Sequence, residues 1–455
     1  MKKLTKLKIK HYKKVSPATS RLNSPGGIIL ICYGLVLIPS TLFLMTEYAS
    51  VTGLSWIDAL FTATSALTVT GLTIVDTSTH FSTAGHTWLI ILMQLGGIGQ
   101  MTLGVFILLA LGKKISIRDQ TLLKEELNQQ STTNISRLIK KIVIFSLTTQ
   151  LIGTIILSIA WIPEFGTREG FYTAFFHAVS AFNNAGFSLF HDSMTGYSKA
   201  PLVTLTITAL FIIGGIGFTV IDDIVSKPRG YRRISLHSKI VLITSFILLI
   251  SGTLILLALE SNNPKTLGGH NFWEQLLMAF FQSATARTAG FNSIEIIEMT
   301  HAGLLVMMIL MFIGAGSSST GGGIKVSTLA VAVIATKSFL QGTSTFDIFK
   351  RSISDTIIFK AFAIIVVSFI TLLTATFLLM ITENARFDVL LFESISAFST
   401  VGLTAGLTAE MSTQGKMIIT FLMIIGRIGP ISIAYLATRP KTMRVRYVNE
   451  DIIIG

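Results

Sequence analysis

The chain has 455 residues; 51% are hydrophobic and 13% are charged, about half the charged fraction of a typical soluble domain. With a mean hydropathy of +0.69, these values exclude a disordered chain, a disulfide-rich secreted module and an ordinary cytosolic enzyme, and they leave a polytopic membrane protein. The net charge of +13 does not indicate nucleic-acid binding because the basic residues flank long apolar runs, and the single cysteine, Cys32, excludes cysteine-based metal sites.

Eight apolar stretches are long enough, at about 20 residues, to cross a hydrocarbon core of about 30 Å. They cover residues 28–45, 87–111, 138–161, 202–224, 240–259, 302–337, 357–381 and 416–437, and glycines and serines interrupt the sixth after residue 312. The basic segment 1–21 lacks a following small-residue cleavage site, so we interpret it as a cytosolic tail and not as a signal peptide.

The basic residues predict the orientation of these spans. If both termini are cytosolic, only six of the 36 Lys and Arg residues lie outside, namely Arg168, Lys199, Lys265, Arg287, Arg386 and Lys416. Because cytosolic segments of membrane proteins are enriched in Lys and Arg, this asymmetry favours eight spans with both ends in the cytosol.

Four further apolar stretches, one after each odd-numbered span, are too short to cross a membrane. They cover residues 56–68, 171–182, 272–285 and 387–398, and each is followed by a small-residue turn with one glycine. The turns are Val69-Thr70-Gly71, Asn184-Ala185-Gly186, Thr288-Ala289-Gly290 and Thr400-Val401-Gly402, with glycines 115, 104 and 112 residues apart.

A second glycine motif repeats in the same register within the even-numbered spans. Its first residues are Gly96, Gly214, Gly314 and Gly426, which follow the turn glycines by 25, 28, 24 and 24 residues. We therefore predict an all-α polytopic membrane protein with four parallel repeats of outer helix, re-entrant helix, glycine turn and inner helix around one central pore. The expected divisions are a tail (1–24), repeat 1 (25–112), a cytosolic connector (113–135), repeats 2 to 4 (136–226, 227–345 and 346–438) and a tail (439–455).

The four turns predict a site for a monovalent cation. Irregular backbone at membrane depth is tolerated only when it is buried in protein or lines a watery cavity. Glycine allows left-handed backbone, which aims consecutive carbonyls in one direction, and rings of carbonyl oxygens replace the hydration shell of a cation. None of the turns contains Asp or Glu, which argues against a divalent ion. A single turn of this kind has the simpler interpretation of a helix C-cap.

These turns resemble those of the Trk, Ktr and HKT superfamily of potassium-transport proteins, over about residues 25–440. The moderate length favours the membrane subunit of the bacterial Ktr branch. The resemblance implies that the four glycines select K⁺, held by the filter carbonyls. It also implies uptake that can depend on Na⁺, a homodimer, and a cytosolic ring of RCK subunits that bind the regulatory nucleotide in place of this chain. The expected location is the bacterial plasma membrane.

A run of small and hydroxylic residues, here called the Gly/Ser loop (residues 314–325), interrupts the third inner span. It contains Gly314, Ala315, Gly316, Ser317, Ser318, Ser319, Thr320, Gly321, Gly322, Gly323 and Lys325. Its helix propensity is poor, and it resembles the intramembrane gate loop of the family. A packing kink is the alternative, whereas the pattern and context of a phosphate-binding loop are not matched. The other three inner spans lack such a run.

Two arginines lie close to these motifs. Arg427 follows the fourth inner glycine, and we expect it below the filter, where it repels cations or holds the Gly/Ser loop; snorkelling is the alternative. We expect Arg287, beside the third turn, to be clamped to a carboxylate such as Glu274 or Glu295. Asn183 and Asn184 are expected to tie the second turn to its neighbours, with an ion-facing amide as the alternative.

Three expectations concern partners and competing functions. The connector is either a solvated linker or a docking surface, the isoleucine-rich C-terminal tail packs against protein, and the basic N-terminal tail attracts anionic lipids. A secondary transporter for a small solute is the main alternative function, although ionisable residues in mid-span are scarce. Ser188 with His177 or His191 resembles an intramembrane protease only superficially, because a serine nucleophile needs a positioned base.

Overall fold

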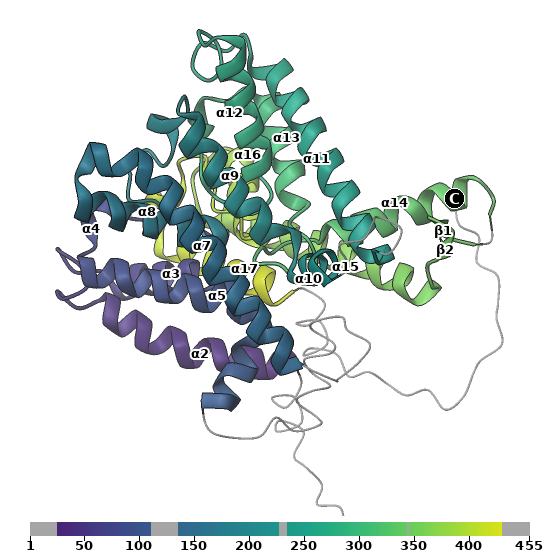
Figure 1. Ribbon diagram of the computed structural model, residues 1–455, viewed down its shortest axis with the longest axis horizontal. Helices are drawn as coiled ribbons and strands as arrows, with labels where there is room; N and C mark the ends of the chain where they lie inside the picture. Colours follow the sequence, from purple (N-terminus) through teal and green to yellow (C-terminus); the bar gives the residue numbers. More distant parts are fainter. Residues whose placement is uncertain (1–24, 111–134, 227–233, 344, 430–455) are drawn as a thin grey trace, which may run out of the picture.

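The computed structural model describes residues 25–110, 135–226, 234–343 and 345–429, and its described part is almost entirely helical (Figure 1). The predictions for both tails, and for nearly all of the connector, lie outside the described residues. Most helices form four successive units, each with an outer, a short and an inner helix. The units are α2 (Pro25–Leu44), α3 (Trp56–Leu67) and α5 (Thr83–Ala110); α7 (Ile135–Phe165), α8 (Thr167–Phe182) and α9 (Pro201–Ile216); α11 (Leu236–Glu260), α12 (Phe272–Thr285) and α13 (His301–Phe312); and α15 (Asp355–Thr382), α16 (Phe387–Ser399) and α17 (Thr413–Ile428).

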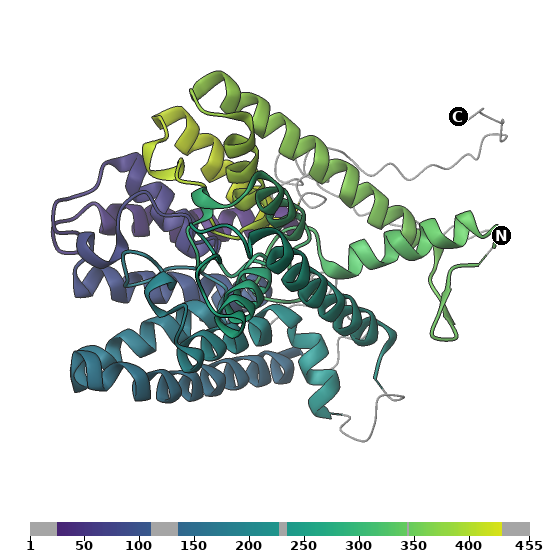
Figure 2. The same cartoon turned by 90° about the horizontal axis from the view of Figure 1, so that it is seen from above.

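Smaller elements complete the described part of the chain. They are α4 (Thr77–His80), α10 (Phe218–Ser226), α14 (Val326–Leu340), the strands β1 (Asp347–Ile348) and β2 (Arg351–Ser352), and 3-10 turns at Thr195–Tyr197, Ile296–Glu298 and Thr408–Glu410. The antiparallel hairpin was not expected, and its tight turn places Phe349 and Lys350 at φ 52° and 60°. Together with α14 it projects away from the other units in both views (Figures 1 and 2).

The helix lengths by themselves account for fewer membrane crossings than the eight predicted. Among the described residues, α7, α11 and α15 are long and apolar enough to cross, and α9 with α10 makes a fourth if that bent pair is one broken span. Shorter apolar helices occupy Leu30–Leu44, His301–Phe312 and Val326–Leu340, and the last two flank the Gly/Ser loop. The eight-span topology therefore stays a prediction.

The second inner span is also broken, which the sequence did not lead us to expect. The α9 helix ends at Gly217, which has a φ of 108°, and α10 continues at an angle of 94°. The amide of Phe218 donates to the carbonyl of Ser318 at 2.8 Å. A Cβ on Gly217 would lie 2.3 Å from the carbonyl oxygen of Ser317, so the approach of the Gly/Ser loop requires glycine here.

The four units contact one another in cyclic order. The inner helix of each unit packs against the short helix of the next, in the pairs α5 with α8, α9 with α12, α13 with α16 and α17 with α3. Because the last unit contacts the first, the four units close into a ring.

Local capping explains where the inner helices begin. Thr300 and Ser412 are the N-caps of α13 and α17, and their hydroxyls accept from the amides of Gly303 and Gly415. Glu260, at the end of α11, accepts from the amide of Thr300 at 3.0 Å, and Glu383, just after α15, accepts from that of Ser412 at 3.1 Å. Outer and inner helices are thus joined by a carboxylate in the third and fourth units.

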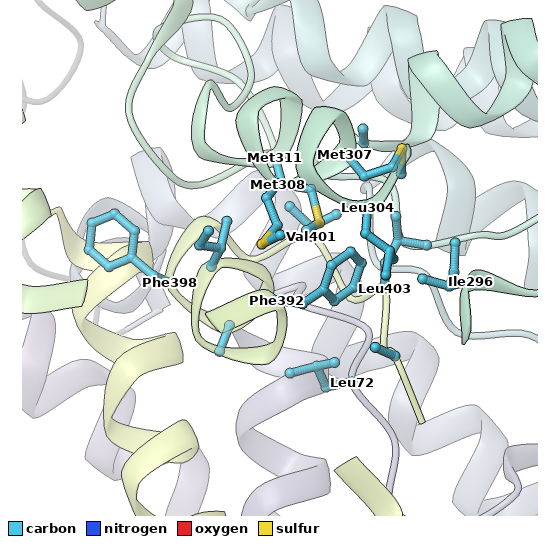
Figure 3. Packing of buried hydrophobic residues seen from close by; sticks show 14 of the residues in the cluster. Leu72, Ile296, Leu304, Met307, Met308, Met311, Phe392, Phe398, Val401 and Leu403 are labelled. Atoms are coloured by element: carbon cyan, nitrogen blue, oxygen red, sulfur yellow. The ribbon is translucent and has the colours of Figure 1, made fainter. Parts of the chain in front are cut away.

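Apolar packing joins the third and fourth units. Met307, Met308 and Met311 of α13 lie near Phe392 of α16 and belong to one cluster of buried apolar residues with it (Figure 3). Many large apolar side chains also face outward, among them Phe246 at 65% exposure and Phe359 at 74%. An apolar exterior of this kind suits a hydrocarbon surrounding.

Candidate functional site

The four turn glycines form a closed ring at the centre of the molecule. A Cβ built on Gly71 would lie 2.5 Å from the carbonyl oxygen of Ala185, and one on Gly186 would lie 2.9 Å from the Cα of Gly290. A Cβ on Gly290 would lie 2.6 Å from the oxygen of Val401, and one on Gly402 would meet that of Thr70. Residues more than 100 positions apart are therefore in contact, and the ring has no room for side chains at these positions.

All four turns have the same unusual backbone. The first and third residues of each turn have positive φ: 56° and 93° at Val69 and Gly71, 59° and 71° at Asn184 and Gly186, 76° and 79° at Thr288 and Gly290, and 50° and 92° at Thr400 and Gly402. The middle residues do not. When the sign of φ alternates along a segment, successive carbonyls face the same side, so this backbone aligns the carbonyl oxygens of each turn.

Hydrogen bonds hold the amides of the turns away from the centre. The middle amides of Thr70, Ala185 and Val401 each donate to a backbone carbonyl in the preceding short helix at 2.8 Å, and that of Ala289 does so at 3.0 Å. Gly71 and Gly402 donate to the hydroxyls of Ser65 and Ser396. Because these amides are already bonded to the short helices, they do not compete for the backbone carbonyls of neighbouring turns.

The Gly/Ser loop lies directly against these turns. Gly316 and Thr320 donate their amides to the carbonyls of Gly215 and Gly214 at 2.8 and 3.3 Å. A Cβ on Gly321 would meet the hydroxyl of Thr288, and one on Gly322 would meet that of Thr400. The loop is therefore a non-helical segment packed under two of the turns.

Two cationic side chains hold the carbonyls of this loop. Arg427, with 1% of its surface exposed, donates to the carbonyls of Thr320 and Gly96, the latter at 2.5 Å. Lys325 donates to the carbonyl of Gly321 at 2.5 Å. The structure thus brings together Arg427 and the loop, as expected, and it gives Arg427 a buried position with direct partners, which contradicts snorkelling.

The expected partner of Arg287 is wrong. Its guanidinium donates to the backbone carbonyl of Ser245 at 3.2 Å, and Glu274 instead forms a capping box with Asn271. Glu274 lies in the first turn of α12, whereas Arg287 follows the end of that helix, so the length of α12 separates the carboxylate from the guanidinium. Glu295 is exposed on the surface.

The asparagines of the second turn bind protein neighbours. Asn183 donates to Gln94 at 2.7 Å, and Asn184 accepts from the hydroxyl of Thr320 at 3.0 Å and donates to that of Thr288 at 3.4 Å. Asn184 therefore links the second turn, the third turn and the Gly/Ser loop.

Sequence analysis missed a polar position in the short helices that supports the turns. His177 and Glu393 lie nine residues before their turn glycines, and Gln282 lies eight before its own. Each accepts the amide that is three residues after the glycine, from Leu189 at 3.3 Å, Ser293 at 3.4 Å and Ala405 at 3.0 Å. We call these residues the brace residues. Alignment of the repeats on their glycines brings His177 and Glu393 into register and leaves Gln282 one residue away.

His177 also meets Ser188, but as part of this support. The His177 Nδ1 faces the carbonyl of Thr173 at 2.8 Å; a carbonyl only accepts, so Nδ1 carries the proton and Nε2 accepts from Ser188 at 3.0 Å. The imidazole is completely buried and stacks on Phe190 at 4.8 Å. Glu393 occupies the matching position and makes the matching contact to Thr404, so the Ser–His pair has a structural explanation.

Comparisons with known proteins show the family to which the chain belongs. The TrkH family, described as cation transport protein, matches residues 28–447. The chain is 51% identical to the Ktr system potassium uptake protein B of Vibrio alginolyticus, covering 96% of this chain and 97% of that protein. It is 43% identical to the protein of the same name in Bacillus subtilis, covering 95% and 97%, and 36% identical to the potassium/sodium uptake protein NtpJ of Enterococcus hirae, covering 99% and 100%.

A solved structure shares the fold. The crystal structure of the potassium transporter TrkH from Vibrio parahaemolyticus superposes with a TM-score of 0.74 at 18% identity, covering 95% of this chain and 87% of that one. The chain therefore belongs to the TrkH family of cation transport proteins and is a multi-pass, helical membrane protein. Within that family it resembles the B subunits of Ktr systems throughout its length.

Proposed function

We propose that the chain is the K⁺-translocating membrane subunit of a Ktr-type potassium uptake system. The ring of four glycine turns with alternating φ is the single observation that carries this proposal. The names of the similar proteins supply the ion, because potassium uptake is the activity they share.

In this proposal the carbonyl oxygens of the four turns form the selectivity filter. K⁺ loses its hydration water as it enters and is coordinated by these oxygens, in the manner of known potassium filters. The middle-residue amides are already bonded to the short helices, so no reorganisation is needed when the ion arrives. The four units then surround one pore, with the repeat boundaries given above.

The Gly/Ser loop acts as the gate. It lies against the third and fourth turns, and Arg427 and Lys325 place positive charge beside it. A fixed positive charge about 4 Å from a K⁺ ion costs roughly 4 kcal/mol at an effective dielectric constant of about 20. Since about 1.4 kcal/mol corresponds to a factor of ten, conduction requires this part of the structure to move.

The remaining parts of the proposal come from the family resemblance and the related proteins. The chain functions in the bacterial plasma membrane as a homodimer with cytosolic termini, under an RCK ring that binds the nucleotide. Anionic lipids attract the basic tail. Na⁺ stimulates uptake, a proposal supported by the name of the Enterococcus relative, a potassium/sodium uptake protein.

Uptake of K⁺ into potassium-depleted cells that lack their own uptake systems tests the proposal. The intact chain with an RCK partner is expected to restore uptake, and added Na⁺ to increase it. Replacing Gly290 should weaken K⁺ preference. Uptake of another solute with no K⁺ dependence would instead favour the alternative, a secondary transporter.

A further inference from the structure

A cavity of about 190 Å³ lies between α9 and α11. Its lining includes Ile212 and Ile216 of α9, Leu242 and Phe246 of α11, and Arg287. An apolar protein cavity of about 150 Å³ is large enough to bind benzene, so this one accommodates a segment of a hydrocarbon chain.

Arg287 brings a positive charge to this apolar cavity. Its guanidinium makes one hydrogen bond, to the carbonyl of Ser245 at 3.2 Å, and its buried Nε has no partner among the described residues. The ion pairs found in the described part of the chain do not include it. A charged group at membrane depth is costly unless opposite charges or carbonyls satisfy it, and the unpaired Nε of Arg287 leaves a donor for an anion.

The location of the cavity indicates the source of that anion. Phe246 lines the cavity and is 65% exposed on the outside of the helix bundle, where lipid surrounds the protein. Ser245 is nine residues after Leu236, the first residue of α11, which corresponds to about 14 Å along the helix. In the predicted topology, α11 begins on the cytosolic side, so the cavity is reached from the cytosolic leaflet.

We propose that this cavity binds an anionic lipid, with a carboxylate or phosphate oxyanion on Arg287 and an acyl segment between α9 and α11. The planar guanidinium suits either oxyanion because it offers two parallel N–H donors. A free fatty acid and an anionic phospholipid share this chemistry, and the experiment distinguishes them.

The bound lipid is placed to influence transport, and this part rests on the proposed function. Arg287 immediately precedes the third turn, at Thr288. Gly215 and Ala315 line the same cavity, and the carbonyl of Gly215 accepts from the amide of Gly316 in the Gly/Ser loop. A lipid here therefore contacts the anchor of the loop, and its occupancy changes the ease with which the loop moves.

Photolabelling tests the binding independently of transport. The full-length purified protein is labelled in phosphatidylcholine vesicles with a diazirine fatty acid, in competition with either oleate or phosphatidylglycerol. Labelling is expected on α9 or α11, and Arg287→Gln should reduce it about tenfold or more. Arg386→Gln, which removes an exposed arginine on Asp388, is the matched control and should label like the wild type. Competition by oleate alone identifies a fatty acid, and competition by phosphatidylglycerol identifies a phospholipid.

Labelling that is unchanged in Arg287→Gln, or absent from α9 and α11 in the wild type, would overturn the proposal. If Arg287→Gln does not fold, Leu242→Trp decides the matter, because it fills the cavity and retains the charge; it too should lose the label. K⁺ flux in the same vesicles, with and without the competing lipid, is a separate measurement. Loss of labelling in a protein that carries no K⁺ would leave the lipid site standing and contradict the proposed function.

Discussion

The guanidinium of Arg427 donates a hydrogen bond to the backbone carbonyl of Thr320, 107 residues earlier in the chain. A second bond from the same group reaches the carbonyl of Gly96, so one side chain joins the fourth inner helix to the Gly/Ser loop and to the first inner helix. Both acceptors are backbone atoms, so their positions depend on the fold and not on the identity of the side chains. Substitution of Arg427 alone therefore removes both hydrogen bonds that link these three segments.

Replacing Arg427 by alanine should increase K⁺ flux in the absence of the regulatory partner. The change removes two charge-assisted hydrogen bonds, each contributing roughly 1.5–3 kcal/mol, and one positive charge beside the loop. We expect flux into K⁺-loaded proteoliposomes, measured with ⁸⁶Rb⁺, to rise about tenfold or more. The control is Arg386→Ala, on the exposed outer surface. Unchanged or lower flux at equal protein content would contradict the proposal that the Gly/Ser loop is a gate.

Replacing Gly290 by serine should reduce the preference for K⁺ over Na⁺. The glycine has a φ of 79°, and an added Cβ would lie 2.6 Å from the carbonyl oxygen of Val401. That oxygen must move, and residues held in such backbone carry strain of about 1–3 kcal/mol, which corresponds to a selectivity loss of roughly 5-fold to 150-fold if all of it falls on K⁺ coordination. Competition between Na⁺ and ⁸⁶Rb⁺ measures the preference.

Gly53→Ser is the matched control for that variant. Gly53 has a φ of 72° but no heavy atom within 4 Å of an added Cβ. It therefore experiences the same kind of backbone strain without a neighbour to displace, and should retain selectivity. Equal loss of selectivity in both variants would show that strain alone, and not the ring, is responsible.

The helices could be predicted closely from the sequence, whereas their contacts could not. The short helix Phe272–Thr285 was expected at the same bounds from its apolar run, and the structure shows that a capping box between Asn271 and Glu274 begins it. The break at Gly217 was missed, since it depends on the carbonyl of Ser317 from the next repeat. The partner of Arg287 was wrong for a related reason: its acceptor is a backbone carbonyl, which no residue pattern identifies.

The candidate site was located by repetition more than by any single motif. Each turn glycine alone has the interpretation of a helix cap, and only the common register of the four directs attention to a ring. The brace residues were not found because His177, Gln282 and Glu393 differ in chemistry and Gln282 is one residue out of register with the other two, although each accepts the amide three residues after its turn glycine. A shared geometric role is invisible when residue types are compared.

Replacing Glu393 by leucine should weaken both stability and ion selectivity. Its carboxylate accepts from the amide of Ala405 at 3.0 Å and from the hydroxyl of Thr408 at 2.7 Å, as well as from Thr404. Leucine leaves these buried donors without acceptors, at a cost of about 1–3 kcal/mol each. The melting temperature should fall, and Na⁺ should compete more effectively with ⁸⁶Rb⁺.

Two further variants separate the brace from a general packing effect. Glu393→Gln keeps one acceptor oxygen and should recover part of the selectivity. Ser394→Ala removes only a bond within the same helix, to the carbonyl of Leu390, and should behave like the wild type. Selectivity that stays intact in Glu393→Leu would mean that the loop after the fourth turn has no influence on the ring.

The outer ion pair between His191 and Asp76 should make stability depend on pH. The Nδ1 of His191 lies 2.5 Å from the Asp76 carboxylate, linking the loops after the first and second turns. The hydrogen bond and charge of Asp76 raise the pKa of His191 above its ordinary value of 6.5, helped by the charges of Asp192 and Glu295. Partial burial alone would raise the pKa of Asp76, but the bonds from Ser78 and His191 outweigh it and lower the pKa below 3.8.

The direction of the effect follows from these two shifts. A raised histidine pKa contributes stability that is fully present below 6.5 and is lost as pH rises through the folded-state value. A lowered aspartate pKa contributes stability above 3.8 that is lost as pH falls through its folded-state value. The pair therefore stabilises between these limits, and His191→Gln should lower the melting temperature there but have little effect at alkaline pH. The change should be small, since the histidine is largely exposed.

A double-mutant cycle with Asp76→Asn checks this assignment. The melting temperature of the detergent-purified protein is recorded at pH values below and above 6.5, the ordinary pKa of histidine. In the Asp76→Asn background, His191→Gln should cause no further loss of the pH-dependent stability, because the coupling energy between two contacting groups disappears when either partner is removed. If His191→Gln lowers the melting temperature equally at acidic and alkaline pH, its contribution comes from packing and not from charge.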